Sequence, residues 1–170
     1  LDLCSMKVPV TIVGVGTCYS YSTDGPTHHA TEDISIMRAL ANMCIFNPAD
    51  SNTSAALVDI SLQTHTPTYI RLDREVLPSI YGQNKKNFDS GISAHYKGED
   101  ICIISTGLMV HRALEVANTL ASYSIQAKVI DVYRLKPLNI NAIKVAIGKS
   151  KKIITIEEHT KNGGLGSMIA

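Results

Sequence analysis

Short β-branched runs alternate with longer segments of helical periodicity along most of this chain. Strands are predicted at 8–15, 43–46, 68–72, 100–105, 127–132 and 152–156. Helices are predicted at 31–40, 54–62, 109–123 and 139–148. Strands and helices in alternation form parallel sheets with helical crossovers. We therefore predict an α/β protein of two three-layer α/β/α units with mostly parallel sheets, and we expect the first strand to be buried.

A segment without clear periodicity divides the two predicted units. Residues 73–99 are rich in Gly, Pro, Lys and Asn, a composition typical of a connection between domains. We place the first unit at 1–80, the linker at 81–98 and the second unit at 99–170. Because the last predicted helix has barely begun at Ala170, we expect both units to be incomplete at the termini of this chain.

Charge and cysteine content exclude several classes of function. The formal net charge is +1, so no field of one sign favours nucleic acid or a membrane surface. No apolar run reaches the roughly 18 residues of a membrane-spanning helix. The cysteines, Cys4, Cys18, Cys44 and Cys102, lie too far apart for a zinc or redox motif. Reduced thiols indicate a cytoplasmic protein. The balanced charge and the short apolar runs indicate that neither nucleic acid nor a membrane is its partner.

A glycine loop for a dinucleotide is incomplete. Gly14 and Gly16 follow the first predicted strand, but the third glycine of the fingerprint would stand where Tyr19 is. A polar loop follows instead of the required helix. Nicotinamide or flavin binding is therefore not predicted.

An acid and two imidazoles surround a Gly-Pro turn after this strand. Asp24 precedes Gly25-Pro26, and His28 and His29 follow it. The carboxyl end of a parallel strand is where ligands bind, and an imidazole there can pass protons or hydrogen-bond a developing alkoxide. In the alternative interpretation, these side chains only cap the helix that begins near Thr31.

Three segments carry a family resemblance. The run from Gly25 to Asp50, GPTHHATEDISIMRALANMCIFNPAD, resembles the transketolase family, most closely the small, often split, prokaryotic type. The segments VIDVYRLKPL and TIEEHTKNGGLGS, which begin at Val129 and Thr155, are similar to the C-terminal domain of that superfamily. The resemblance implies a thiamine-diphosphate-binding fold, with the second half of a pyrimidine-binding domain joined to an incomplete C-terminal domain.

The resemblance also implies roles for individual residues. Asp24 matches the acid that contacts the C2 hydroxyl of the substrate, and His28 matches the histidine that hydrogen-bonds oxygens around the reacting carbon. His29 stands where a Gln is commonest and is a substrate-binding candidate. Arg74 falls where an arginine holds the sugar phosphate, since a guanidinium grips two oxygens at once. Arg71 is a rival for that role, and the alternative for Arg74 is an ion pair with a neighbouring acid.

The cofactor-binding residues are not expected in this chain. The implied cofactor is thiamine diphosphate with Mg²⁺ or Ca²⁺, held by a Gly-Asp-Gly motif on a separate domain, whereas Asp24 is preceded by Thr23. The acid that activates the cofactor is expected upstream of Leu1. Gly16 also replaces a phosphate-facing histidine of the long transketolases, which leaves recognition of phosphate open.

The implied activity is the transfer of a two-carbon ketol unit between sugar phosphates, in a homodimer or with a partner subunit that carries the diphosphate-binding domain. This chain alone should be inactive. Alternatives are a deoxyxylulose-phosphate synthase, a 2-oxoacid dehydrogenase β-type subunit, and a non-catalytic assembly module. His159, next to Gly163-Gly164, could belong to an anion-binding helix N-terminus or only to packing. His65, His95 and His111 are expected to be structural or solvated.

Overall fold

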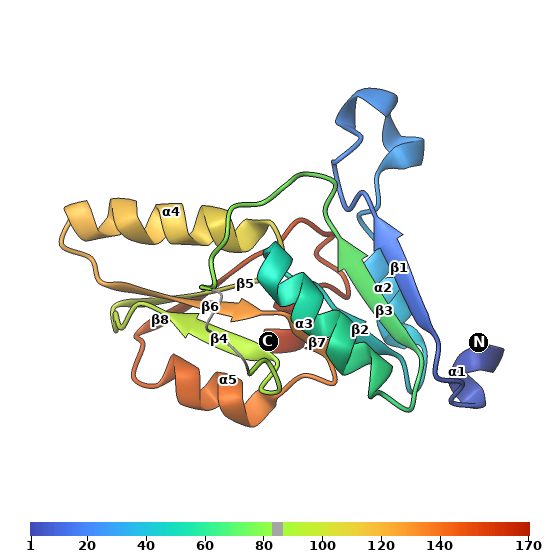
Figure 1. The fold of residues 1–170 in the computed structure, drawn as a ribbon. Helices are drawn as coiled ribbons and strands as arrows, with labels where there is room; N and C mark the ends of the chain where they lie inside the picture. Colours follow the sequence, from blue (N-terminus) through green and yellow to red (C-terminus); the bar gives the residue numbers. More distant parts are fainter. Residues whose placement is uncertain (83–86) are drawn as a thin grey trace.

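The computed structural model describes residues 1–82 and 87–170 and contains two four-stranded sheets (Figure 1). The strand order of the first sheet is β1 (Thr11–Val15), β3 (Thr68–Leu72), β2 (Cys44–Phe46) and β7 (Arg134–Lys136). Within it, β1, β3 and β2 are parallel, as predicted, and β7 is antiparallel to β2.

The order of the second sheet is β4 (Ile92–His95), β6 (Ala127–Val132), β5 (Ile101–Ser105) and β8 (Lys152–Ile156). Here β6, β5 and β8 are parallel, and β4 pairs with β6 in the antiparallel direction. The prediction of mostly parallel sheets is therefore confirmed.

Helices cover both faces of each sheet (Figure 1). They are α2 (Asp33–Ala39), α3 (Ser51–Leu62), α4 (Met109–Ser122) and α5 (Ile140–Ile147), and shorter helices are α1 (Asp2–Ser5) and α6 (Leu165–Ile169). In the first sheet, Ile34 of α2 clusters with Ile45, whereas Leu57 of α3 clusters with Phe46. Adjacent strand residues point to opposite faces, so α2 and α3 lie on opposite sides of that sheet.

The second sheet is layered in the same way. Ala113 of α4 clusters with Ile103, and Ile143 of α5 clusters with Ile104. Ile103 and Ile104 are neighbours on β5 and face opposite sides. Both units are thus three-layered, as the sequence predicts.

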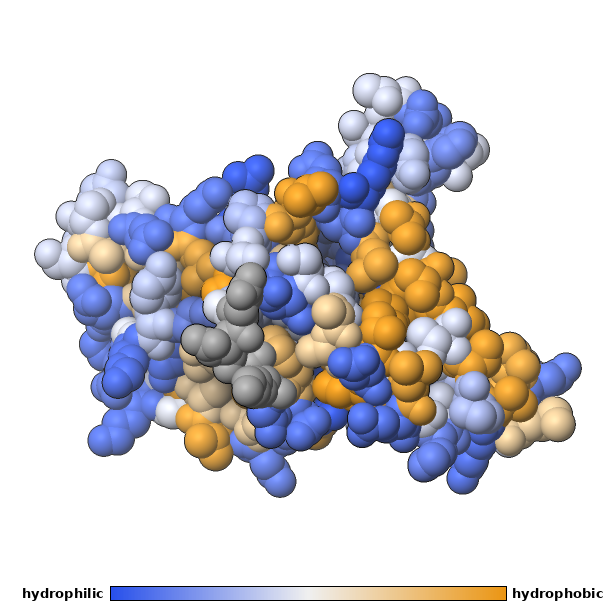
Figure 2. All heavy atoms as spheres, viewed as in Figure 1, coloured by the Kyte–Doolittle hydropathy of each residue, from blue (hydrophilic) through white to orange (hydrophobic). Residues whose placement is uncertain are grey.

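The first strand is less buried than predicted. It begins at Thr11, and its residues alternate between exposed and half-buried, with Val13 51% and Val15 61% exposed. The reason is its position at the edge of the sheet, where it pairs only with β3 among the described residues. Val58 and Leu62 of α3 are also exposed, and Figure 2 shows apolar surface gathered on the side where β1 and α3 lie.

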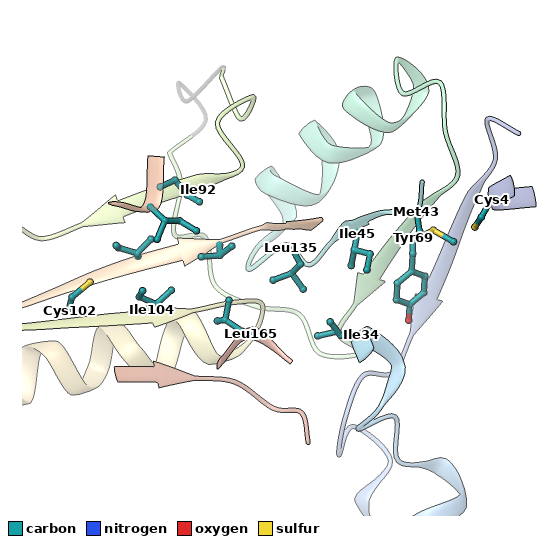
Figure 3. Packing of buried hydrophobic residues seen from close by; sticks show 13 residues of the cluster. Cys4, Ile34, Met43, Ile45, Tyr69, Ile92, Cys102, Ile104, Leu135 and Leu165 are labelled. Carbon is teal, nitrogen blue, oxygen red and sulfur yellow. The ribbon is translucent and has the colours of Figure 1, made fainter. Parts of the chain in front are cut away.

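One apolar core joins the two sheets (Figure 3). Ile34, Ile45 and Tyr69 from the first unit belong to the same cluster as Ile104 and Leu135 from the second. Burial of a large aliphatic side chain stabilises a fold by about 1.5–3 kcal/mol. The two units therefore stabilise each other through shared apolar contacts.

The sequence predicts a linker at 81–98 with short pieces of structure, and β4 is one such piece. The strand β7 was not predicted, although it joins the first sheet from within 99–170. Both strands are short and pair with strands far away in the sequence, which periodicity does not reveal. The helix predicted at 31–40 begins later, because α2 starts at Asp33 after its N-cap residue Glu32, and the Thr31 hydroxyl donates to the Glu32 side chain.

The sheets meet at the carboxyl ends of their strands. Asn47, just after β2, donates through Nδ2 to the hydroxyl of Thr106, just after β5, at 3.1 Å. The Thr106 hydroxyl in turn donates to the carbonyl of Val132 at the end of β6, at 2.7 Å. The strand ends that usually bind ligands in α/β proteins are therefore brought together.

Candidate functional site

The Asp24–His29 segment belongs to a loop that projects from the end of β1 (Figure 1). Two 3₁₀ turns, η1 (Ser22–Asp24) and η2 (Pro26–His28), form its tip, and Gly25 joins them at φ 84°. A residue with a Cβ is strained at that angle, so the turn requires glycine. Cys18 and Ala30 close the base of the loop through a β-bridge.

The loop presents two of the predicted side chains to the surface. Asp24 and His28 are exposed, and His28 Nδ1 lies 3.1 Å from the Thr27 hydroxyl. His29 is half-buried, with its ring 5.0 Å from that of Tyr19, and its Nε2 is buried without a hydrogen-bond partner among the described residues. Among the described residues, no hydrogen bond joins Asp24, His28 or His29 to the first turn of α2, where His159 accepts the Ser35 N–H, so the alternative in which Asp24 and the two histidines cap this helix is wrong.

Arg74 lies beside this loop. It follows the end of β3 and is exposed, and its guanidinium carbon is 4.7 Å from the ring centroid of Tyr21. The Tyr21 ring centroid is also 6.5 Å from that of His28. Arg74 and His28 therefore both lie near the ring of Tyr21, a residue to which the sequence assigned no role.

The Arg74 side chain makes no ion pair with a neighbouring acid in the described part of the chain. Asp73 is occupied by other donors. Its carboxylate accepts hydrogen bonds from the hydroxyls of Thr17 and Ser20 and from the backbone N–H groups of Arg74 and Glu75. These bonds fix the backbone at Arg74 and leave its guanidinium available to a ligand.

Arg71 lies in a different environment. It is 4% exposed, and its Nε donates to Asp33 Oδ2 at 2.8 Å. Burial lowers the pKa of Arg71, but the charge of Asp33 and the hydrogen bonds outweigh it and the pKa is raised. The cation is therefore retained and engaged within the fold, whereas Arg74 offers the exposed guanidinium.

The Arg71 guanidinium also holds the base of the loop. Nη2 donates to Cys18 Sγ at 2.7 Å, to the Ala30 carbonyl at 3.4 Å and to the Glu158 carbonyl at 3.3 Å. Burial raises the pKa of Cys18 to about 11, so it is a neutral thiol, and it donates its proton to the Glu158 carbonyl. Both ends of the loop and the segment after β8 thus converge on Arg71.

The glycine segment near His159 already contains its own anion. The Glu157 carboxylate accepts hydrogen bonds from the N–H groups of Leu165 and Gly166 at 2.6 and 2.8 Å, at the start of α6. His159 accepts the Ser35 N–H at Nε2 and donates from Nδ1 to the Thr160 carbonyl. These contacts assign a packing role to His159, which fastens the second unit to α2.

The remaining histidines differ in their surroundings. His111 donates from Nε2 to the Ala49 carbonyl at 2.7 Å, and His95 Nε2 lies 3.3 Å from the Tyr81 hydroxyl. His65 is exposed. His95 and His111 therefore contribute structural contacts rather than a ligand set.

Asp50 is a buried acid that the sequence analysis did not assign. It caps α3 by accepting the Thr53 N–H at 2.8 Å, and its other oxygen accepts the N–H groups of Ile80 and Tyr81. Burial raises the pKa of Asp50, but these hydrogen bonds outweigh it and the pKa is lowered. The sequence signal for this role was an acid directly before a helical run. Through Ile80 and Tyr81, Asp50 fixes the start of the linker to the first unit.

Two broader observations limit what the site can do. In residues 1–82 and 87–170, no group of three or more His, Cys, Asp or Glu side chains is arranged to hold a metal ion. The same residues contain no helix that is both long and apolar enough to span a membrane. On the first of these observations, the described side chains do not fit a metal-diphosphate site.

The chain is an α/β protein of two three-layer units that meet at the carboxyl ends of their strands. Family models described as transketolase, pyrimidine binding domain, and transketolase, C-terminal domain, match residues 2–79 and 92–170. The chain belongs to the transketolase family.

Individual relatives agree with this assignment. The chain is 32% identical to one subunit of the apulose-4-phosphate transketolase of Actinobacillus succinogenes, over 100% of this chain and 55% of that protein. It is 34% identical to 1-deoxy-D-xylulose-5-phosphate synthase of Halothermothrix orenii, over 99% of this chain and 27% of that one.

A solved structure described as a split gene transketolase, inactive beta4 tetramer, matches with a TM-score of 0.90 and 32% identity. That match covers 99% of this chain and 54% of the solved chain. Its fold confirms the predicted fold class. The chain therefore spans about half the length of the apulose-4-phosphate transketolase subunit and of this solved chain.

Proposed function

We propose that this chain is the sugar-binding part of a transketolase that transfers a two-carbon ketol unit between sugar phosphates. The grouping of His28 and Arg74 around Tyr21, at the strand ends beside Asp24, carries the proposal. An acid and an imidazole suit the hydroxyl and carbonyl end of a sugar, and a free guanidinium suits a distant phosphate.

Each side chain has a defined task in this proposal. Asp24 accepts a hydrogen bond from the C2 hydroxyl, and His28 hydrogen-bonds the oxygen on the reacting carbon. Arg74 binds the phosphate. His29 stays a candidate for substrate binding, and its half-buried ring supports the loop by packing against Tyr19. Arg71 remains a second candidate for phosphate, although its contacts with Asp33 and Glu158 favour a supporting role.

Thiamine diphosphate supplies the carbanion chemistry when it is bound, and the protein supplies orientation and polar groups. We propose that Mg²⁺ or Ca²⁺ and the diphosphate are held by a domain outside residues 1–170, in a homodimer or on a partner subunit. A similar solved structure is described as a split gene transketolase, and this chain covers 54% of that chain, which supports this division. We also propose a cytoplasmic location, which the free cysteines support.

A deoxyxylulose-phosphate synthase is the second candidate, because one such enzyme is 34% identical to the chain. The products separate the two functions. A transketolase gives a ketose two carbons longer than the acceptor, whereas the alternative gives deoxyxylulose phosphate.

The test is a His28→Ala variant of the complete enzyme. Loss of one hydrogen-bond donor to the reacting oxygen should lower kcat by about 100- to 1000-fold and leave cofactor affinity nearly unchanged. His65→Ala, which changes an exposed histidine between α3 and β3, is the matched control and should retain full turnover. Wild-type turnover in His28→Ala would show that the loop has no catalytic part.

A further inference from the structure

The Tyr21 ring occupies the space above Gly16. A Cβ placed on Gly16 would overlap Cε2 of Tyr21 and lie 3.0 Å from Cδ2 and 3.3 Å from Cζ. Gly16 also has φ 88°, a conformation that disfavours residues with a Cβ. The first residue after β1 therefore has to be glycine for Tyr21 to pack here, and Tyr21 fills the volume that a side chain at this position would occupy.

The same ring carries the Arg74 guanidinium, 4.7 Å from its centroid. A cation over an aromatic face is attracted by the ring quadrupole. A guanidinium resting on a ring still directs N–H groups outward in its own plane, where they can bind two oxygens of an anion. Because the Asp73 carboxylate is occupied by Thr17, Ser20 and backbone donors, the contact with Tyr21 orients the Arg74 side chain.

We propose that Tyr21 is a specificity-determining residue, which holds Arg74 in position for a terminal tetrahedral anion of an open-chain sugar. This inference rests on the proposed function, because the reacting end of the same sugar is placed at Asp24 and His28. The site selects sugars with a terminal phosphate or sulfonate over neutral sugars of the same length. His28, with its ring centroid 6.5 Å from that of Tyr21, links this position to the reacting end.

Binding of unreactive ligands to the complete protein tests the role of Tyr21 without any need for turnover. The probes are a five-carbon sugar alcohol with a terminal phosphate, the same alcohol with a terminal sulfonate, and the unsubstituted alcohol. None has a carbonyl group, so none can act as a ketol donor or acceptor. Isothermal titration with each probe measures recognition of the anion alone.

Tyr21→Leu should weaken binding of the anionic probes about three- to fivefold, the size of a partly exposed cation–π contact. Arg74→Ala should weaken it roughly tenfold or more. Tyr21→Phe keeps the ring and should bind like wild type, and the exposed Tyr123→Leu at the C-terminal end of α4 is the matched control. The neutral alcohol should be unaffected throughout.

Equal effects of Tyr21→Leu on neutral and anionic probes would overturn the inference, as would a Tyr21→Phe variant as weak as Tyr21→Leu. The probe that binds more tightly, phosphate or sulfonate, identifies the anion, and either result supports the role of Tyr21. A wild-type protein that discriminates the probes but transfers no ketol unit would refute the proposed function and leave the Tyr21 inference intact. Ketol transfer that is unchanged in both Tyr21→Leu and Arg74→Ala would leave the proposed transfer intact and refute the Tyr21 inference.

Discussion

Neutralising Asp33 should destabilise the protein far more than neutralising an acid of a surface ion pair. Asp33 Oδ2 accepts hydrogen bonds from Arg71 Nε at 2.8 Å and from the Tyr69 hydroxyl at 3.0 Å. The side chains of Arg71 and Asp33 are only 5% and 15% exposed. In Asp33→Asn, the buried guanidinium would keep its position and lose its charged partner.

The magnitude follows from the burial of this pair. Removing one partner of a buried ion pair typically costs about 3–5 kcal/mol, because the remaining charge stays desolvated. The amide of Asp33→Asn keeps an oxygen that can accept from Arg71, so we expect the lower end, about 3 kcal/mol, or roughly 150-fold in the folding equilibrium. Cys18 does not compensate, because burial raises the pKa of its thiol to about 11.

Urea unfolding of the complete protein, followed by far-ultraviolet circular dichroism, measures the difference. The matched control is Glu115→Gln, which breaks the Arg112–Glu115 pair at 3.0 Å with side chains 62% and 64% exposed. It should cost less than about 0.5 kcal/mol. The double variant Asp33→Asn/Arg71→Met should be more stable than the sum of the single effects predicts, since it removes both charges.

The base of the loop should loosen in the same variant, because Arg71 binds both Cys18 and Ala30. Limited proteolysis within 18–30 should therefore be faster in Asp33→Asn than in Glu115→Gln. Equal unfolding free energies and equal cleavage rates for these two variants would refute the reasoning.

Two further predictions concern acid stability and the cofactor. Burial raises the pKa of Asp50, but hydrogen bonds from Tyr81 and Thr53 outweigh it, so the folded pKa lies below 3.8 and Asp50 stabilises the fold above about pH 4. Asp50→Asn should lower the free energy of unfolding by about 1–3 kcal/mol at pH 7. This gap should narrow in urea titrations as the pH falls through the folded pKa, and a gap that does not change with pH would contradict the assignment. The 170-residue chain alone should not bind thiamine diphosphate with Mg²⁺ in calorimetric titration, and a saturable heat of binding would argue against a separate cofactor domain.

Periodicity was sufficient for the strands that build the parallel sheets, because they are short β-branched runs that are distinct in composition from the helical and polar segments between them. The strands at 68–72, 127–132 and 152–156 agree with the structure residue for residue. In contrast, β4 and β7 are only four and three residues long, and their partners are β6 and β2. Their formation depends on tertiary contacts that a local pattern does not contain.

The candidate site shows the same division between local and distant information. The turn of Asp24 and His28 is predictable, because Gly25-Pro26 dictates it locally. The separation of Arg71 from Arg74 is not, because it depends on an ion pair 38 positions away in the sequence. Tyr21 was not singled out because an aromatic residue in a polar loop carries no local signal for the cation it contacts.

The position of the loop that carries Asp24 and His28 depends on both units. Arg71 donates to the Glu158 carbonyl, and Arg38 donates to the Gly163 carbonyl, so the segment after β8 is fastened both to the loop base and to α2. His159 adds a third link by accepting the Ser35 N–H. Two of these contacts use backbone carbonyls of residues 157–164, so changing the side chains of this segment would remove only the His159 link. The second unit therefore positions the proposed sugar site through two backbone carbonyls and the His159 side chain, and an effect of that unit on turnover requires no catalytic side chain from it.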